Sequence, residues 1–186
     1  MWIPLSDTIP VEVAADLDTA ARAAVRGGQA AMRHYRRDGL SISDKGVNDP
    51  VTEADHAANR AILDVLSESA TGDPILSEES PPPATDVLRD SGHERLWVVD
   101  PLDGTKEFIA QNGEFSVMVG LSIAGRAAVG AVFQPDPGVL YLGWTGGGAW
   151  SVPVELDGED VQIGSPSPLR LEPESASAVR LIRSRS

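Results

Sequence analysis

The segment Leu96-Trp97-Val98-Val99-Asp100-Pro101-Leu102-Asp103-Gly104-Thr105 is the most informative part of this sequence. Its first four residues are apolar and predict a buried strand that ends at Asp100. The proline and the glycine that follow are typical of a tight turn, and we expect a short helix from Thr105 to about Gln111. The order predicts a strand end that carries two carboxylates, a glycine and a hydroxyl, directly before a helix N-terminus.

This strand end has the chemistry of a site for Mg²⁺ and phosphate. Asp100, Asp103 and the Leu102 carbonyl between them supply hard oxygen donors, which Mg²⁺ prefers. Gly104 lets an anion approach the backbone closely, and a helix that begins at Thr105 favours an anion at its N-terminus. The alternative is an ordinary Asp-Pro and Asp-Gly surface turn. The apolar strand favours a binding site, because ligands in sheet proteins sit at strand ends.

A second short apolar run also ends in acids. Pro74-Ile75-Leu76 is followed by Ser77-Glu78-Glu79-Ser80, which predicts another strand with carboxylates at its end. Taken alone, two adjacent glutamates are common on solvated surfaces. If the two strands are neighbours, we expect Glu78 to converge with Asp100 and Asp103 on one cation site or two.

A third segment places an acid at the start of a helix. Pro50 stops any helix before it, and Thr52 or Glu53 begins the helix that follows. Asp55 falls in its first turn, where the simplest interpretation is a favourable interaction with the helix dipole.

Together these segments resemble the inositol monophosphatase-like superfamily, whose members are metal-dependent phosphatases. The resemblance covers about residues 10–186 and rests on Lys45, Asp49–Asp55, Leu76–Ser80 and Trp97–Phe108. Within the superfamily, Asp103–Phe108 followed by Asn112-Gly113-Glu114-Phe115 is most similar to the 3′(2′),5′-bisphosphate nucleotidase branch.

The resemblance implies a role for each matching residue. It implies that Mg²⁺, at two or three ions per complete site, is ligated by Glu78, Asp100, the Leu102 carbonyl and Asp103. Glu79 assists a further ion, and Lys45 lies on a mobile loop that reaches toward the metals. Asp55 and Thr105 act with Glu78 in catalysis, the first two as a pair that takes the proton from a metal-bound water. Substrate contacts come from Glu78, Leu102, Asp103, Gly104 and Thr105, with the Gly104 and Thr105 N–H groups holding the phosphate.

The implied reaction is hydrolysis of a phosphomonoester by metal-activated water, without a covalent enzyme intermediate. The branch implies conversion of adenosine 3′,5′-bisphosphate to AMP and phosphate. Inositol phosphate and fructose 1,6-bisphosphate are alternative substrates, and an inactive metal-binding fragment is a third interpretation.

One element of the family pattern is absent from the sequence. The family takes another metal-binding aspartate from a Trp-Asp motif in its C-terminal half. We therefore expect a C-terminally truncated member, with an α+β metal-binding domain at 1–155 and a linker and the first strand of a second domain at 156–186. For such a chain we expect weak or absent activity, and an exposed sheet edge that favours a homodimer. The four tryptophans are followed by Ile3, Val98, Thr145 and Ser151.

Composition excludes several other classes of protein. There is no cysteine, which excludes disulfides and thiolate metal sites, and the net charge of −13 disfavours nucleic acid polymers as partners. We expect a small phosphorylated substrate instead, bound through local cations. No run approaches the about 18 apolar residues of a membrane span, and no signal peptide is visible. We expect a cytoplasmic protein, and peripheral association with the inner membrane stays open.

The periodicity predicts an α+β fold. We expect a helix over 11–37, bent at Gly27-Gly28, a second helix over 53–69, and a short strand over 40–43. Apolar runs at 115–124, 127–133, 139–144 and 149–154, separated by turn signals, predict an antiparallel meander. The prediction is a layered sandwich of two N-terminal helices on an antiparallel sheet. The resemblance implies a sugar-phosphatase-like fold whose second α/β domain is largely missing.

Overall fold

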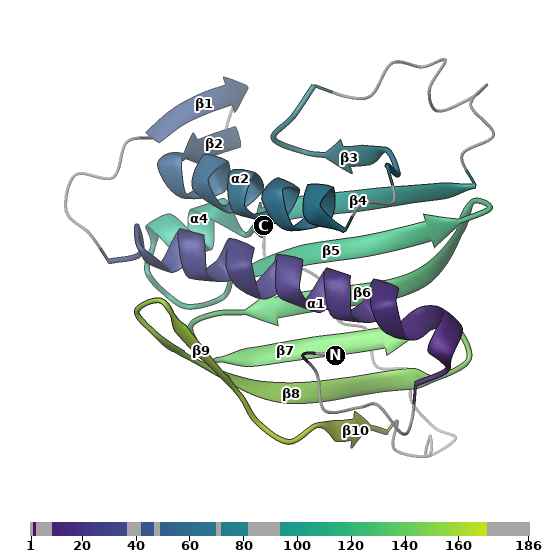
Figure 1. Cartoon of the computed structure of the whole chain (residues 1–186). Coiled ribbons are helices and arrows are strands. Elements are labelled where there is room, and N and C mark those ends of the chain that lie inside the picture. The colour runs from purple at the N-terminus through teal and green to yellow at the C-terminus, as the bar shows by residue number, and fades with distance from the viewer. Residues whose placement is uncertain are drawn as a thin grey trace, which may run out of the picture.

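Two long helices lie across one face of an eight-stranded sheet in the computed structural model (Figure 1). The structure describes residue 2 and residues 9–36, 42–46, 49–69, 72–81 and 94–170. The helices are α1 (Val11–Met32), α2 (Glu53–Glu68) and the short α4 (Thr105–Ile109). The strands are β1 (Ile42–Gly46), β2 (Asp49–Thr52), β3 (Ile75–Ser77), β4 (Arg95–Asp103), β5 (Ser116–Ile123), β6 (Arg126–Gln134), β7 (Val139–Trp144), β8 (Gly148–Asp157), β9 (Asp160–Ile163) and β10 (Ser167–Leu169).

The sheet order is β10-β8-β7-β6-β5-β4-β3, with β9 paired to β8. The predicted meander is confirmed, because β4 to β8 pair as antiparallel neighbours. The sheet is mixed and not purely antiparallel, since β3 runs parallel to β4. β1 and β2 form a separate antiparallel hairpin directly before α2. The predicted α+β architecture of two helices on one sheet is therefore correct, with one parallel pair added at the β3 edge.

Burial alternates along the strands as expected for a sheet with one face in the core. Val117, Val119 and Leu121 of β5 are buried while the residues between them are partly exposed. α1 packs on β5, β6 and β7, and α2 packs beside it on β4 (Figure 1).

Gly27 and Gly28 let α1 approach its neighbours closely. A Cβ at Gly28 would lie 2.6 Å from Cε1 of Phe133 and 2.9 Å from Cγ of Pro135, and one at Gly27 would lie 2.7 Å from Cγ1 of Ile62. α1 is a single helix from Val11 to Met32. The glycine pair thus accounts for close packing on β6 and α2, and the predicted bend is not needed to explain it.

Arg95 ties three segments together at the start of β4. Its guanidinium donates to both carboxylate oxygens of Asp16 on α1, at 2.7 and 3.1 Å, and to Asp73 before β3 at 2.9 Å. The hydrogen bond to Asp16 is the main cause that raises the pKa of Arg95 above its ordinary value. This network holds α1 and the approach to β3 against β4.

The predicted linker after residue 155 is partly wrong. β8 continues to Asp157, and β9 and β10 both pair with β8. Residues 156–169 therefore belong largely to the same sheet. Residues 171–186, where we expect the first strand of a second domain, lie outside the described part of the chain, and the domain division itself stays a prediction. No helix in the described ranges has the length and apolar character needed to cross a membrane.

Candidate active site

The two acid-bearing strand ends lie side by side because β3 and β4 are parallel neighbours. Ser77 pairs with Val99, and the Glu78 N–H donates to the Val99 carbonyl at 3.2 Å. Parallel strands bring their carboxyl ends to the same edge of a sheet. Glu78, directly after β3, therefore lies next to Asp100, as the sequence predicts for neighbouring strands. The predicted end of the strand at Asp100 is wrong, because Asp100 still pairs with Met118 and β4 continues to Asp103.

Asp100 and Asp103 are separated by an irregularity in the pairing of β4 with β5. In a regular strand, residues three apart point to opposite faces of the sheet. The irregularity removes that constraint, and the charge of Asp103 acts directly on Asp100. The Leu102 N–H donates to Oδ1 of Asp100 at 3.2 Å, which closes the turn.

Asp100 is the most perturbed carboxyl of this group. Partial burial raises its pKa to about 7, and the negative charges of Glu78 and Asp103 add to the effect. The side chain also shares a hydrogen bond with Glu78. Like charges held this close disfavour ionisation of one another, and a nearby cation reverses the effect.

This donor set fits Mg²⁺ in kind. It consists of three carboxylates and the Leu102 carbonyl, all hard oxygen donors. The negative charges of the three carboxylates repel one another, and a divalent ion would relieve this repulsion. Among the described residues, no three His, Asp or Glu side chains form a preassembled metal cage. Glu78 and Asp103 are exposed residues, so these ligands face solvent while Leu102 is buried. The residues are gathered, but their side chains are not arranged around a central point.

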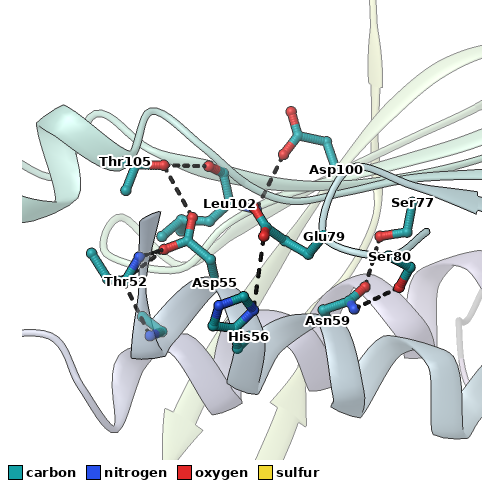
Figure 2. Close-up of polar contacts among 11 residues, drawn as sticks. Thr52, Asp55, His56, Asn59, Ser77, Glu79, Ser80, Asp100, Leu102 and Thr105 are labelled. Carbon is teal, nitrogen blue, oxygen red and sulfur yellow. Dashed lines mark hydrogen bonds and ion pairs between the residues drawn. The ribbon is translucent and has the colours of Figure 1, made fainter. Parts of the chain in front are cut away.

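Asp55 lies at the start of α2, where its position indicated a dipole interaction and the family resemblance implied a catalytic pair with Thr105. Thr52 is the N-cap, and Asp55 completes a capping box: its Oδ2 accepts from the Thr52 N–H at 2.7 Å and from Thr52 Oγ1 at 2.6 Å (Figure 2). The Ala54 N–H in turn donates to Thr52 Oγ1 at 3.1 Å. Asp55 is only 2% exposed. The capping box within Thr52-Glu53-Ala54-Asp55 therefore sets the start of α2 and also the position of this buried carboxylate.

Thr105 connects Asp55 to the β4 strand end. Thr105 Oγ1 lies 3.1 Å from Oδ1 of Asp55 and 3.2 Å from the Leu102 carbonyl oxygen (Figure 2). A hydroxyl has one hydrogen to donate, so only one of these acceptors receives it at a time. The arrangement places the Thr105 hydroxyl between the buried Asp55 carboxylate and the Leu102 carbonyl, which we expect to ligate metal.

Gly104 makes the turn into α4. Its φ of +89° lies in the left-handed region, and a Cβ there would lie 2.9 Å from the Glu114 carbonyl oxygen. No side chain caps α4. The first N–H groups of a helix have no intrahelical partner, and phosphate binding by the N–H groups of Gly104 and Thr105 stays a prediction.

Two side chains at this site were missed or undervalued in the sequence. The side chain of His56 is half exposed, and its Nδ1 lies 3.8 Å from Oε2 of Glu79, whose side chain is 4% exposed. Asn59 contacts Ser77 and Ser80 on either side of Glu78 and Glu79 (Figure 2). The available signal for Asn59 was its spacing of four from Asp55, which puts both on one face of α2.

Lys45 is not in the loop that we expected. It lies within β1 in the hairpin with β2. Its side chain is outside the described part of the structure, so its approach to the metal ligands stays a prediction.

The two-helix fold, with acidic residues at two adjacent strand ends and a glycine-started helix beside them, defines the inositol monophosphatase class. The sequence model described as "Inositol monophosphatase family" matches residues 13–184, and the chain belongs to this family. The family expected from the motifs is therefore confirmed.

Named relatives refine this assignment. The chain is 43% identical over 128 residues to the 3′(2′),5′-bisphosphate nucleotidase CysQ of Shigella flexneri, over 67% of this chain and 50% of that protein. It is 34% identical over 159 residues to the Nus factor SuhB of Escherichia coli K12, over 81% of this chain and 58% of that protein. The crystal structure of CysQ from Bacteroides thetaiotaomicron superposes with a TM-score of 0.63 at 35% identity, over 74% of this chain and 49% of that one. The chain thus spans about half the length of the first curated relatives it matches.

Proposed function

We propose that this chain supplies the Mg²⁺-binding and phosphate-binding side of a phosphomonoester hydrolase. The observation that carries the proposal is the proximity of Glu78 and Asp103 to Asp100, whose pKa their charges raise, together with the Asp55–Thr105 contact. Family membership supports the reaction class.

Mg²⁺ held by Glu78, Asp100, Asp103 and the Leu102 carbonyl would neutralise the phosphate and lower the pKa of the attacking water. This supply of positive charge matters because the chain carries a net charge of −13 and would otherwise repel a phosphate ester. The acids thus prepare an anion site only when a cation is present.

The chain's own groups have separate tasks in this proposal. The N–H groups of Gly104 and Thr105 donate to phosphate oxygens at the start of α4, where the helix dipole favours an anion. Thr105 Oγ1 passes a proton from the water toward Oδ1 of Asp55, with which it is already in contact at 3.1 Å. The capping box holds Asp55 in place during this transfer.

The proposed substrate is a nucleoside 3′,5′-bisphosphate, with adenosine 3′,5′-bisphosphate converted to AMP and phosphate. Similarity to proteins named 3′(2′),5′-bisphosphate nucleotidase supports this choice. Membership of the inositol monophosphatase family supports inositol phosphate as an alternative substrate. Inositol 1-phosphate and fructose 1,6-bisphosphate are the comparison substrates.

A second candidate function is Mg²⁺ binding without turnover. The absence of a Trp-Asp pair from the sequence favours it, because the resemblance assigns a further metal ligand to that motif.

The test combines calorimetry with Mg²⁺ and phosphate release from the three substrates, with the double variant Asp100→Asn/Asp103→Asn as control. Mg²⁺ binding with release fastest from the nucleotide supports the first proposal, and binding without release supports the second. Absence of Mg²⁺ binding by the folded parent chain overturns both.

A further inference from the structure

The buried face of α2 carries two polar side chains, Asp55 and Asn59, one helical turn apart. The other buried residues of this helix are all apolar: Ala54, Ala58, Ile62 and Leu66. Asp55 faces Thr105 after β4, whereas Asn59 faces the turn after β3 (Figure 2). Each of the two buried polar residues of α2 therefore meets one of the two strand ends that form the candidate site.

Asn59 holds both ends of the turn that bears the glutamates. Its Oδ1 accepts from Ser77 Oγ at 2.7 Å, and its Nδ2 donates to Ser80 Oγ at 3.0 Å. The Ser80 N–H donates to the Ser77 carbonyl at 3.3 Å, so Glu78 and Glu79 lie inside a turn closed by backbone and side chain together. Asn59 and Ser77 are 6% and 4% exposed, so their hydrogen bond is buried, whereas the hydrogen bond from Asn59 to Ser80 is partly buried.

The turn has little other support from the sheet. β3 pairs with β4 through only three residues, and beyond them the Glu78 N–H makes one more bond, to the Val99 carbonyl. A buried amide costs free energy unless it is fully hydrogen-bonded. An apolar residue of similar volume would fill the same space on α2 but would leave the two hydroxyls without their partner.

We propose that Asn59 is a positioning residue for the cation site. It fixes the Ser77–Ser80 turn against α2 and thereby directs Glu78 toward Asp100. It acts through the two serines and does not itself contact the ion or the substrate. The proposal rests on the proposed Mg²⁺ site. It goes beyond that site by naming the residue that holds Glu78, after β3, in position relative to Asp100 on β4.

The first experiment measures the Mg²⁺ dissociation constant of Asn59→Leu by calorimetry, well below the unfolding midpoint of the metal-free variant. Loss of a residue that orients a ligand is expected to weaken binding by about 10- to 100-fold. Ser67→Ala is the matched control, since it removes an exposed hydrogen bond from the same helix, and its affinity should equal that of the parent. The Ser77→Ala/Ser80→Ala variant should weaken binding as much as Asn59→Leu, and adding Asn59→Leu to it should cause no further loss.

The second experiment needs no metal. Amide hydrogen exchange in chelator should become about tenfold faster or more at the Glu78 and Ser80 N–H groups of Asn59→Leu, while Val119 in β5 stays protected. If the parent chain binds no Mg²⁺, the proposed function fails and the exchange data alone decide whether Asn59 holds the turn. Unchanged exchange at both groups, or faster exchange with an unchanged Mg²⁺ dissociation constant, overturns the positioning role. A lower unfolding midpoint with unchanged affinity would show that Asn59 is only a packing residue.

Discussion

Replacing Asp55 with asparagine separates two roles that this side chain combines. Oδ2 accepts two hydrogen bonds from Thr52, and Oδ1 faces the Thr105 hydroxyl. An asparagine with its amide oxygen in the place of Oδ2 keeps both contacts with Thr52. Its NH₂ group then faces Thr105 Oγ1 as a donor, and the Thr105 hydrogen turns to its other acceptor, the Leu102 carbonyl at 3.2 Å. The helix cap survives, but the acceptor for the proton is gone.

The magnitudes follow from these contacts. A hydrogen bond to a charged group contributes about 1.5–3 kcal/mol net, against about 0.5–1.5 kcal/mol for a neutral pair. Because Asp55→Asn also removes a buried charge, we expect it to lower the free energy of unfolding by no more than about 2 kcal/mol. Asp55→Ala leaves two Thr52 donors without an acceptor at a site that is 2% exposed, and should cost about 1–3 kcal/mol for each donor.

The assays are urea unfolding followed by tryptophan fluorescence, and phosphate release with saturating Mg²⁺. Asp55→Asn should lose about 10²- to 10⁴-fold in phosphate release while its Mg²⁺ affinity stays that of the parent. Thr105→Ser, which keeps the hydroxyl, is the matched control and should retain activity. Equal destabilisation by Asn and Ala would contradict the hydrogen-bond argument, and parental phosphate release by Asp55→Asn would refute the proton-acceptor role.

Three further predictions test the site and its scaffold. The pKa of Asp100 is raised to about 7 in the metal-free fold, so the native state binds more protons than the unfolded chain and stability falls as pH rises from about 4 to 7. Asp100→Asn should therefore raise the free energy of unfolding in chelator at pH 8 by about 1–2 kcal/mol, after allowance for partial exposure, and should abolish stabilisation by Mg²⁺; urea titrations at pH 4 and 8 measure both. Gly28→Ala should destabilise by about 1–2 kcal/mol in thermal unfolding, because the clash with Phe133 outweighs the gain in helix propensity, whereas Gly130→Ala, with no atom within 4 Å of the new Cβ, serves as the open-space comparison. Arg95→Met removes the guanidinium that binds Asp16 and Asp73 and should cost about 1–3 kcal/mol, with a smaller loss in high salt, measured by urea unfolding.

The sequence predicted those parts of the site that short segments determine. Thr52 and Asp55 lie within one helical turn, and the capping box follows from their spacing. Likewise, Asp100 to Thr105 are one short segment whose residue types indicated acids, a glycine turn and a helix start, and it forms the irregular end of β4, the turn at Gly104 and the first residue of α4. The approach of Glu78 to Asp100 required one added condition, that their strands be neighbours, and the pairing of β3 with β4 meets it.

Contacts between residues far apart in the sequence do not follow from local residue patterns. Asn59 meets Ser77 and Ser80 across 18 and 21 positions, and nothing in the helical period says which polar residue a buried amide will bind. β9 was missed because its four residues follow a two-residue turn at Gly158 inside a polar stretch interpreted as a linker. The Gly158 signal for a hairpin was present, but the weak apolar pattern around it concealed the strand.

The brevity of β3 has a thermodynamic consequence. A three-residue strand at the edge of a sheet can detach without disturbing the ladder from β4 to β8, so one half of the candidate site belongs to a unit that opens at lower free energy than the rest. When an ion binds at both strand ends, part of its binding free energy is used to keep the β3 edge closed. The measured affinity for the ion is then the intrinsic affinity multiplied by the fraction of molecules in which the edge is closed. The occupancy of the ion therefore reports the local order of β3.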